Sequence, residues 1–367
     1  MRIGINARLL GVGPFEGLAR YTVETTRAMA LANPKDIFIL FFDRTPQDTS
    51  WFKDCTNISS EIVYLPTRHP VLMLIWFESL LRKALIKAQI DVFYSADNFL
   101  SLSSQIPTVL VCHDLAYLTY PQGLRWDHLW FYRKFMPLYL KRAEKIITVS
   151  NFVKQDIIRN HHIKEDKITV AGNALPVRME SELDIENDQL KPGKYFVYIG
   201  SIHPRKNISG LIQAFFDFRD KIKGYKLLLI GRLAWKTEEI RLILDDPDIV
   251  KLQNVEDKHL MAYLKKATAL IYPSFSEGFG IPILEGFAAE IPVITSDVTS
   301  MPEVAGEAAL LINPQSIQSM TAAMEKIVHE PDVRDRLIAL GRERLDDFSW
   351  EQSSARIYQQ IEEVKKD

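Results

Sequence analysis

The sequence has only two cysteines among its 367 residues, Cys55 and Cys112. Two cysteines cannot form the disulfide framework on which small secreted domains depend, and so few are typical of a reducing compartment. The longest apolar run, residues 70–77, is far too short to cross a bilayer. The first residues, MRIGIN, predict a strand and not a secretory signal. These absences predict a cytoplasmic protein.

An excess of charge of one sign is also lacking. The net charge is −2, so no nucleic-acid partner is expected. Hydrophobic residues make up 47% of the chain and charged residues 25%, which is ordinary for a globular protein. Because 367 residues exceed what one hydrophobic core usually serves, we expect two domains.

Short apolar runs alternate with longer amphipathic segments along the whole chain. Continuous apolar strands separated by helices are typical of a parallel sheet that is covered on both faces. The fold class is therefore α/β, with two Rossmann-like, doubly wound parallel-sheet domains. The expected strands lie at 2–6, 37–42, 91–95, 108–112, 145–150 and 168–172, and then at 195–200, 225–231, 251–255, 269–274 and 292–296.

The acidic stretch 179–194 is the best candidate for a linker. It divides the chain into a first domain, 1–185, and a second domain, 186–348. A helix follows at 349–367, where Ser349 can cap the N-terminus. Whether this helix packs back on the first domain stays open. Its apolar stripe consists of Trp350, Ile357, Ile361 and Val364.

One loop of the second domain combines glycines with the start of a helix. A predicted strand ends near Ser274, and Pro282 suits the first turn of the following helix. Gly278 and Gly280 would let backbone N–H groups approach a ligand closely, and the helix N-terminus adds partial positive charge. This arrangement predicts a diphosphate site.

Two carboxylates bracket the same loop. Glu277 and Glu285 are separated by seven residues, and both would repel the phosphates that the loop attracts. They are explained if each meets a neutral, hydroxyl-rich part of the ligand, namely its sugars. For Glu285, simple stabilisation of the helix N-terminus is the plainer alternative.

This spacing, in the setting SEGFGIPILEGFA, resembles the E-x7-E motif of the family-4 retaining glycosyltransferases. The resemblance covers nearly the whole chain and includes YIGSIHPRKNISGLIQAF, HDLAYLTYP, ITVSNFVKQDI and FSWEQSSARIY. It implies the GT-B fold, with 1–185 as the acceptor-side domain and 186–348 as the nucleotide-sugar-binding domain. It also implies transfer of a hexose from a nucleotide-diphosphate sugar, with retention and without a metal or another cofactor. HPRKN and HDLAYLTYP resemble the mannosyltransferase-like branch, so GDP-mannose is the expected donor and a UDP-hexose the alternative. The expected acceptor is a lipid-linked saccharide of a bacterial surface polysaccharide.

The resemblance also assigns roles to residues. It implies that Glu285 holds the ribose hydroxyls and that Glu277 meets the hydroxyls of the transferred sugar. Arg205 and Lys206 would hold the diphosphate, and two cations beyond the end of a strand suit a leaving group that gains negative charge. Relatives often have Arg where Ser201 stands, so Arg205 or Arg232 is expected to supply more of the positive charge that holds the diphosphate. The remaining expected donor contacts are Gly17, Ser201, Val255 near the base, Gly278, Phe279, Gly280 and Ile281.

His113 follows the apolar run 108–112 directly. A lone histidine is more often structural than catalytic, but the resemblance implies that this one touches the transferred sugar and stabilises the transition state. Asp114 is expected to support the loop. Arg125, Asp127 and Arg133 are weaker candidates to line an acceptor site.

Two segments, 69–87 and 125–145, mix large apolar side chains with basic ones. A half-buried helix is the plainer interpretation of each. The alternative is an interfacial helix that reaches a lipid-linked acceptor, which would make the protein peripheral on the cytoplasmic face of the inner membrane.

Three other functions stay open on the residues alone: a nucleotide-sugar epimerase on the same fold, an NAD(P)-dependent oxidoreductase and a sugar-nucleotide sensor without turnover. The oxidoreductase is suggested by the glycines of 11–17 and by Asp43 at the end of a strand. No metal is predicted, because Asp246 and Asp248 fit a turn. The pair His161 and His162, with Glu165 nearby, fits the end of a helix.

The stretch GVGPFEGLARYT at 11–22 does not fit the dinucleotide fingerprint, because its glycines are one residue too far apart and Pro14 lacks an N–H group. In the family the matching loop lies near the donor phosphate and the acceptor. Gly17 is the expected contact, followed by a helix from about Leu18. Ligands are expected in the cleft between the domains, outside the carboxyl ends of the strands.

Overall fold

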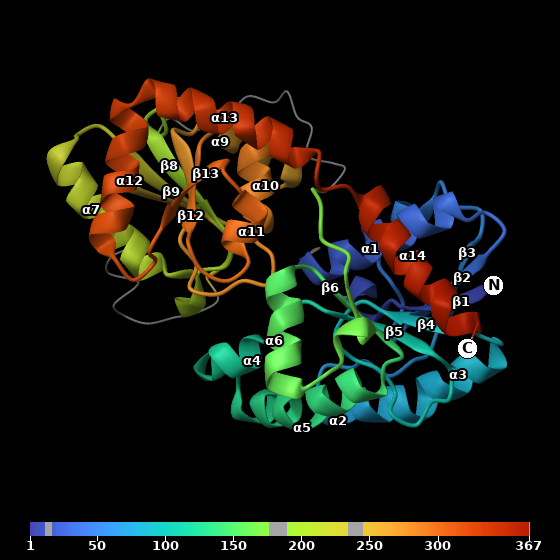
Figure 1. Cartoon of the computed structure of the whole chain (residues 1–367). Helices are drawn as coiled ribbons and strands as arrows, with labels where there is room; N and C mark the ends of the chain where they lie inside the picture. Colours follow the sequence, from blue (N-terminus) through green and yellow to red (C-terminus); the bar gives the residue numbers. More distant parts are fainter. Residues whose placement is uncertain (12–16, 176–188, 234–244, 367) are drawn as a thin grey trace. The chain divides into compact units, whose positions relative to one another are not determined.

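A computed structural model describes residues 1–11, 17–175, 189–233 and 245–366 (Figure 1). The chain forms two compact units. Unit 1 consists of Met1–Asn173 and Ser349–Asp367, and unit 2 of Ala174–Phe348. The expected domain boundary at 185 lies outside the described residues.

Unit 1 contains a seven-stranded sheet within the described part of the chain. Its strands are β1 (Arg2–Asn6), β2 (Ile37–Phe42), β3 (Ile58–Ile62), β4 (Val92–Ser95), β5 (Thr108–Cys112), β6 (Lys145–Thr148) and β7 (Ile168–Val170). They pair in parallel in the order β3-β2-β1-β4-β5-β6-β7. The direction of winding reverses between β1 and β4, and such a switch point is where doubly wound sheets bind ligands.

Helices cover both faces of this sheet (Figure 1). On one face lie α1 (Gly17–Ala32) and α14 (Trp350–Lys366), which pack against each other. On the other lie α2 (Pro70–Ile75), the π-helical turn η3 (Trp76–Leu81), α3 (Arg82–Lys87) and α5 (Trp126–Arg142). The remaining helices are η1 (Arg8–Gly11), η2 (Ser50–Phe52), α4 (Ala116–Thr119), η4 (Pro121–Gly123), α6 (Asn151–His161) and η5 (Glu165–Lys167).

Helix α14 follows unit 2 in sequence but belongs to unit 1. The Ser349 hydroxyl accepts a hydrogen bond from the Gln352 N–H at 3.1 Å, so it caps the helix as expected. The predicted stripe of Trp350, Ile357, Ile361 and Val364 is buried. Burial of this stripe against α1 fixes the position of the helix.

Unit 2 contains a six-stranded sheet among its described residues. Its strands are β8 (Tyr195–Ile199), β9 (Lys226–Ile230), β10 (Ile249–Leu252), β11 (Ala269–Tyr272), β12 (Val293–Ser296) and β13 (Ala309–Ile312). They pair in parallel in the order β10-β9-β8-β11-β12-β13, so the switch point lies between β8 and β11. The helices in the described part of unit 2 are η6 (Pro204–Lys206), α7 (Ile208–Lys221), α9 (Asp257–Lys265), α10 (Ile281–Ala288), α11 (Met301–Ala305), α12 (Ile317–His329) and α13 (Pro331–Leu345).

The expected α/β fold with two doubly wound sheets is confirmed, but several details differ. β3 and β13 were not expected, and β10 begins at Ile249 instead of 251. β3 has the sequence ISSEI and lies at an edge, half exposed, so it lacks the continuous apolar run that marks a buried strand. The expected helix 69–87 is interrupted by the π-helical turn, in which Trp76 and Phe77 are completely buried.

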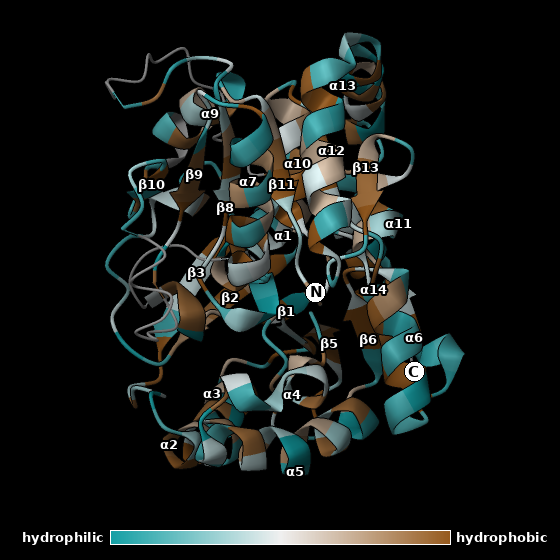
Figure 2. Cartoon of the chain, turned by 90° about the vertical axis from the view of Figure 1, so that its left-hand side faces the viewer, coloured by the Kyte–Doolittle hydropathy of each residue, from teal (hydrophilic) through white to brown (hydrophobic). Residues whose placement is uncertain are grey.

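Figure 2 shows the apolar residues, in brown, gathered on strands such as β9 and on the inward sides of helices. Exposed large apolar side chains also occur on α2 and α5, including Val71, Ile75, Trp126 and Trp130. No helix in the described ranges is long and apolar enough to span a membrane.

Candidate functional site

The clearest candidate site lies at the switch point of the unit 2 sheet. Arg205 and Lys206 belong to η6, which follows β8, and Glu277 lies in the loop after β11. Because β8 and β11 are adjacent and parallel, both loops leave the same edge of the sheet. The two loops are joined by a hydrogen bond from the Phe275 N–H to the Arg205 carbonyl at 2.9 Å.

Both cations contact the same carboxylate. Arg205 Nη1 lies 2.9 Å from Glu277 Oε2, and Lys206 Nζ lies 2.5 Å from Glu277 Oε1. Arg205 Nη1 also donates to the Ser276 carbonyl. Lys206 Nζ donates to the Tyr272 hydroxyl at 2.7 Å. The predicted diphosphate-binding pair and the predicted sugar-binding carboxylate therefore form one cluster.

The cluster keeps Glu277 ionised. Only 7% of this residue is exposed, and burial alone would raise the pKa of its carboxyl group. The charges of Lys206 and Arg205 outweigh burial and lower the pKa of Glu277 to about 2. A carboxylate with this pKa accepts hydrogen bonds at neutral pH and cannot act as a proton donor.

The Glu277 loop is held by two hydroxyl side chains before α11. The Glu277 N–H donates to Thr299 Oγ1 at 3.2 Å. The Ser300 hydroxyl lies within hydrogen-bond distance of the Glu277 and Phe279 carbonyls, at 3.0 and 2.9 Å. Gly280 then starts α10 with a φ of 107°, a conformation that glycine adopts without strain. The loop is thus fixed by contacts that the apolar pattern of the sequence does not reveal.

The other expected donor residues of unit 2 follow strands of the same sheet. Glu285 is buried in α10, and Gly278 and Phe279 are buried in the loop, whereas Ile281 is half-buried. The Ser201 carbonyl accepts from the Tyr198 hydroxyl at 3.1 Å. Val255 is half-buried beyond β10, the edge strand, and Arg232 is exposed beyond β9.

His113 follows β5 in unit 1. Its Nε2 atom lies 2.8 Å from the Ala96 carbonyl, and its ring packs edge-on against Tyr21, with the ring centroids 4.8 Å apart. Burial lowers the pKa of His113 below its usual 6.5, so the imidazole is neutral at pH 7. Nε2 must then carry the proton that the carbonyl accepts, which leaves Nδ1 as an acceptor. Asp114 supports the loop as expected, because Oδ1 accepts from the Ala116 N–H at 3.1 Å.

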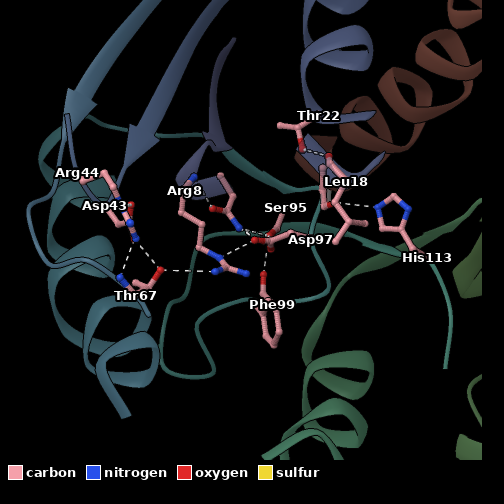
Figure 3. A network of polar contacts seen from close by, with 12 residues as sticks. Arg8, Leu18, Thr22, Asp43, Arg44, Thr67, Ser95, Asp97, Phe99 and His113 are labelled. Carbon is pink, nitrogen blue, oxygen red and sulfur yellow. Dashed lines mark hydrogen bonds and ion pairs between the residues drawn. The ribbon is translucent and has the colours of Figure 1, made fainter. Parts of the chain in front are cut away.

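A second ion pair lies at the switch point of unit 1, and the sequence patterns did not reveal it. Arg8 follows β1, Asp97 follows β4, and Arg8 Nε lies 2.6 Å from Asp97 Oδ2 (Figure 3). Asn6 Nδ2 donates to the other carboxylate oxygen at 2.6 Å. The position of both residues just beyond neighbouring strands is the signal that could have identified them.

The glycine stretch is described only in part. Residues 12–16, which include Pro14, lie outside the described residues. Gly17 is the first residue of α1 and is exposed, and a Cβ atom built on it would meet nothing within 4 Å. The helix expected from about Leu18 is confirmed.

Asp43 has no oxygen left for a dinucleotide ribose. It is completely buried, and Arg44 donates to its two oxygens at 2.8 and 2.7 Å. The Thr67 N–H and hydroxyl both donate to Oδ2 at 2.7 Å. The observation that suggested an oxidoreductase is therefore explained by a structural role.

The weaker acceptor candidates lie on or beside α5. Arg125 and Asp127 form an ion pair with each other, with Nη2 of the arginine 2.9 Å from Oδ2 of the aspartate. The Arg125 side chain is 75% exposed, and Arg133 is exposed on the same helix. Among the described residues, no hydrogen bond or ion pair links Arg125, Asp127 or Arg133 to Arg8 or His113, so their role stays a prediction.

The residues with metal-ligand spacing have other partners. Arg219 Nη1 lies 2.7 Å from Asp246 and 3.1 Å from Asp248. His161 Nε2 lies 2.8 Å from the Tyr117 hydroxyl. Glu165 forms an ion pair with Lys154 at 3.0 Å.

Two family models match the chain. The model described as Glycosyltransferase Family 4 matches residues 15–178, and the model described as Glycosyl transferases group 1 matches residues 181–344. Together they cover most of the chain, one in each half.

Curated relatives share just over a quarter of the sequence. O-antigen chain mannosyltransferase B of Escherichia coli is 28% identical over 357 residues, which cover 92% of this chain and 93% of that protein. The capsular polysaccharide biosynthesis glycosyltransferase CapM of Staphylococcus aureus is 28% identical over 265 residues, 66% of this chain and 68% of that protein.

Solved structures match the whole chain. The sucrose-phosphate synthase of Thermosynechococcus elongatus superposes with a TM-score of 0.75 at 17% identity, over 99% of this chain and 98% of that one. HepE of Anabaena, in complex with UDP-glucose, superposes with a TM-score of 0.73 at 13% identity, over 99% and 100% of the two chains. These likenesses show the GT-B fold.

Proposed function

Because this chain belongs to the family-4 glycosyltransferases, we propose that it transfers mannose from GDP-mannose to a hydroxyl of a lipid-linked saccharide. The transfer retains the anomeric configuration and serves the synthesis of a surface polysaccharide. Relatives named as O-antigen mannosyltransferases support the sugar and the process. The observation that carries the proposal is the cluster of Arg205, Lys206 and Glu277 at the switch point of unit 2.

The two cations are suited to the leaving diphosphate. When the bond between the anomeric carbon and the phosphate oxygen breaks, negative charge grows on that oxygen, and a fixed guanidinium and ammonium stabilise it. Arg205 and Lys206 are already held in place by Glu277, Ser276 and Tyr272. Little reorganisation is then needed when the donor binds.

Glu277 is suited to binding hydroxyls and poorly suited to covalent catalysis. Two cations neutralise its carboxylate, which weakens it as a nucleophile, and its pKa of about 2 prevents it from donating a proton. We therefore propose attack on the face that the phosphate leaves. The acceptor oxygen bonds to the anomeric carbon as the phosphate departs, and the departing phosphate oxygen takes the acceptor's proton.

The remaining donor residues are assigned by position. Glu285 holds the ribose hydroxyls, and the backbone near Val255 meets the base; Gly17, Ser201, Gly278, Phe279, Gly280 and Ile281 supply the closer backbone contacts. His113 accepts a hydrogen bond from a hydroxyl of the transferred sugar through Nδ1. The charges of Arg205 and Lys206 take the place that a divalent cation holds in other transferases, so no metal is required.

We further propose peripheral contact of α5 with an anionic membrane surface. Trp126 is 82% exposed and Trp130 is 55% exposed. The Lys134 ammonium lies 4.9 Å from the centre of the Trp130 ring, and Arg133 is also exposed on this helix. Exposed tryptophans beside basic residues are typical of surfaces that enter the headgroup region.

Cosedimentation with phosphatidylglycerol vesicles tests the membrane contact. We expect the double substitution Trp126→Ser and Trp130→Ser to lower binding at least about tenfold. Leu31→Ser is the matched control, because Leu31 is 47% exposed on α1, which covers the opposite face of the sheet. Equal binding of the wild type and the double variant would refute this contact.

A panel of nucleotide sugars tests the donor. We expect GDP-mannose to raise the melting temperature more than UDP-, ADP- and TDP-sugars, and to release GDP when a saccharide acceptor is added. Conversion of the sugar nucleotide without an acceptor would indicate the epimerase alternative. Binding of all sugars without any turnover would indicate a sensor.

A further inference from the structure

The two units share an arrangement that no sequence motif marks. In each sheet the winding reverses between two adjacent strands, β1 and β4 in unit 1 and β8 and β11 in unit 2. In each, a cation beyond the first of these strands meets a carboxylate beyond the second: Arg8 with Asp97, and Lys206 with Glu277. The crevice at a switch point is the usual ligand position in such sheets.

Arg8 is held in a fixed orientation. Its Nε lies 2.6 Å from Asp97 Oδ2 in an ion pair, and its guanidinium carbon lies 4.9 Å from the centre of the Phe99 ring. The carboxylate is fixed in turn, because Asn6 Nδ2 and the Ser95 hydroxyl donate to Oδ1 at 2.6 and 3.2 Å. Figure 3 shows Arg8 between Thr67 on one side and Ser95 and Asp97 on the other. The Arg8 side chain keeps 10% of its surface exposed, against 2% for Asp97.

The balance of charge indicates which ligand fits. In unit 2 two cations contact one carboxylate, so these three side chains together carry a positive charge, which suits a diphosphate. In unit 1 the ion pair of Arg8 and Asp97 is neutral, and the neighbouring pair of Arg44 and Asp43 is also neutral. A neutral pair gives a phosphate no net attraction, whereas the guanidinium fork can still donate to hydroxyl oxygens.

The surroundings of Arg8 are aromatic. The Phe99 ring under the guanidinium lies 5.7 Å from the ring of Tyr132, centre to centre. Burial raises the pKa of the Tyr132 hydroxyl to about 12, so this hydroxyl stays protonated and able to hydrogen-bond. Aromatic rings beside hydrogen-bonding groups match a sugar, which has apolar C–H faces and polar edges.

We propose that Arg8 binds the acceptor by donating hydrogen bonds to hydroxyls of a neutral sugar residue, and that Asp97 is the positioning residue that orients it. This inference rests on the proposed function and assigns the acceptor side of the same reaction. An ion pair that merely closes the sheet edge is the competing explanation. The ion pair of Arg44 and Asp43 serves as the control for this competing explanation. It is also buried, but it lies beyond β2, one strand away from the switch point.

Steady-state kinetics of the full chain test the proposal, with GDP-mannose as donor and octyl α-mannoside as acceptor probe. We expect Arg8→Lys, which keeps the charge but loses the fork, to raise the acceptor KM at least about tenfold more than the donor KM. Asp97→Asn should shift the two constants in the same way. The control Arg44→Lys should leave both near the wild-type values.

Each other outcome has a definite meaning. Equal changes in the two KM values for Arg8→Lys and Asp97→Asn, or an equal shift with Arg44→Lys, would overturn the proposal in favour of a structural ion pair. If Arg8→Lys does not fold, Asp97→Asn decides alone. If the wild type transfers mannose to phosphorylated acceptors but not to octyl α-mannoside, the neutral-sugar assignment is overturned. The proposed function would then remain intact. No turnover of any nucleotide sugar would overturn the proposed function itself.

Discussion

Lys206 Nζ lies 2.5 Å from Glu277 Oε1, across the point where the strand order of the unit 2 sheet reverses. The two residues are far apart in sequence and meet because β8 and β11 are neighbours. A buried ion pair of this kind contributes little if it is exchanged for apolar groups, but removal of one partner leaves a buried charge unpaired. We propose that this pair serves a nucleotide-sugar donor, whose binding needs both charges.

Replacement of Lys206 tests the role of the cations. We expect Lys206→Ala to lower kcat/KM at least about tenfold, a loss of ~1.4 kcal/mol of transition-state stabilisation. Glu285→Ala should lower it by a similar factor through the ribose. Lys221→Ala is the matched control, since Lys221 pairs with Glu325 on the surface and is 62% exposed. Near-wild-type kinetics for both Lys206→Ala and Glu285→Ala would contradict the assigned donor site.

The depressed pKa of Glu277 predicts acid lability. The pKa falls from 4.5 to about 2 on folding, so the pair stabilises the folded state fully above pH 4.5 and loses this effect as the pH falls toward 2. Complete protonation of Glu277 removes about 3 kcal/mol, and about 2 kcal/mol of this is lost between pH 6 and pH 3. Urea unfolding between pH 6 and pH 3 measures it. The difference in unfolding free energy between the wild type and Glu277→Gln should shrink steadily as the pH falls, and a constant difference would refute the shift.

Metal independence is tested by chelation. Arg205 and Lys206 supply the positive charge at the predicted leaving group, so transfer should proceed at its full rate in excess EDTA. Initial rates with and without EDTA, and after addition of Mg²⁺ or Mn²⁺, measure this. A strict requirement for a divalent cation would show that the two side chains do not suffice.

Protonation of His113 should inhibit the enzyme. Burial lowers its pKa below 6.5, so the neutral form that can accept through Nδ1 predominates at pH 7 and is lost only on further acidification. We expect an acid limb in the pH profile of kcat/KM, with its midpoint below pH 6.5, and expect His113→Gln to remove it. His329→Gln, at an exposed position at the end of α12, is the control. An acid limb that persists in His113→Gln must come from another group.

Replacement of Gly231 tests the packing of the sheet edge that carries the candidate donor site. Its φ is 150°, and a Cβ atom there would lie 2.0 Å from the Gly200 carbonyl oxygen. We expect Gly231→Ala to lower the melting temperature far more than Gly224→Ala. Gly224 has a φ of 86° but open space around it, so that control isolates the backbone strain of about 1–2 kcal/mol. Equal decreases in melting temperature for the two variants would mean that the loops of Gly200 and Gly231 move apart easily.

Local patterns predicted most of the strands, because a strand buried on both faces must be apolar throughout. β1, β2 and β5 have the predicted bounds. β3 was not predicted, because most of its residues are exposed at the edge of the sheet and the strand has no continuous apolar run. The π-helical turn at 76–81 was not predicted either, because its pattern of apolar side chains does not differ from that of a regular helix.

The candidate donor site was predicted for a similar reason. Glu277 and Glu285 lie close in sequence within one loop and helix, so a short motif records them. No short motif contains both Arg8 and Asp97, since 88 residues lie between them. Only the strand order, which no local pattern specifies, brings them together.

Unit 1 is discontinuous, because the segment from Ser349 completes it after the whole of unit 2. Trp350 packs edge-on against Tyr21 at 5.7 Å between ring centroids, and Tyr21 packs in the same way against His113. On the ribosome, unit 2 can thus finish folding while the half of the protein made first still lacks one of its helices. The order of synthesis and the order of completion are reversed, and His113 gains its full surroundings only after unit 2 has been made.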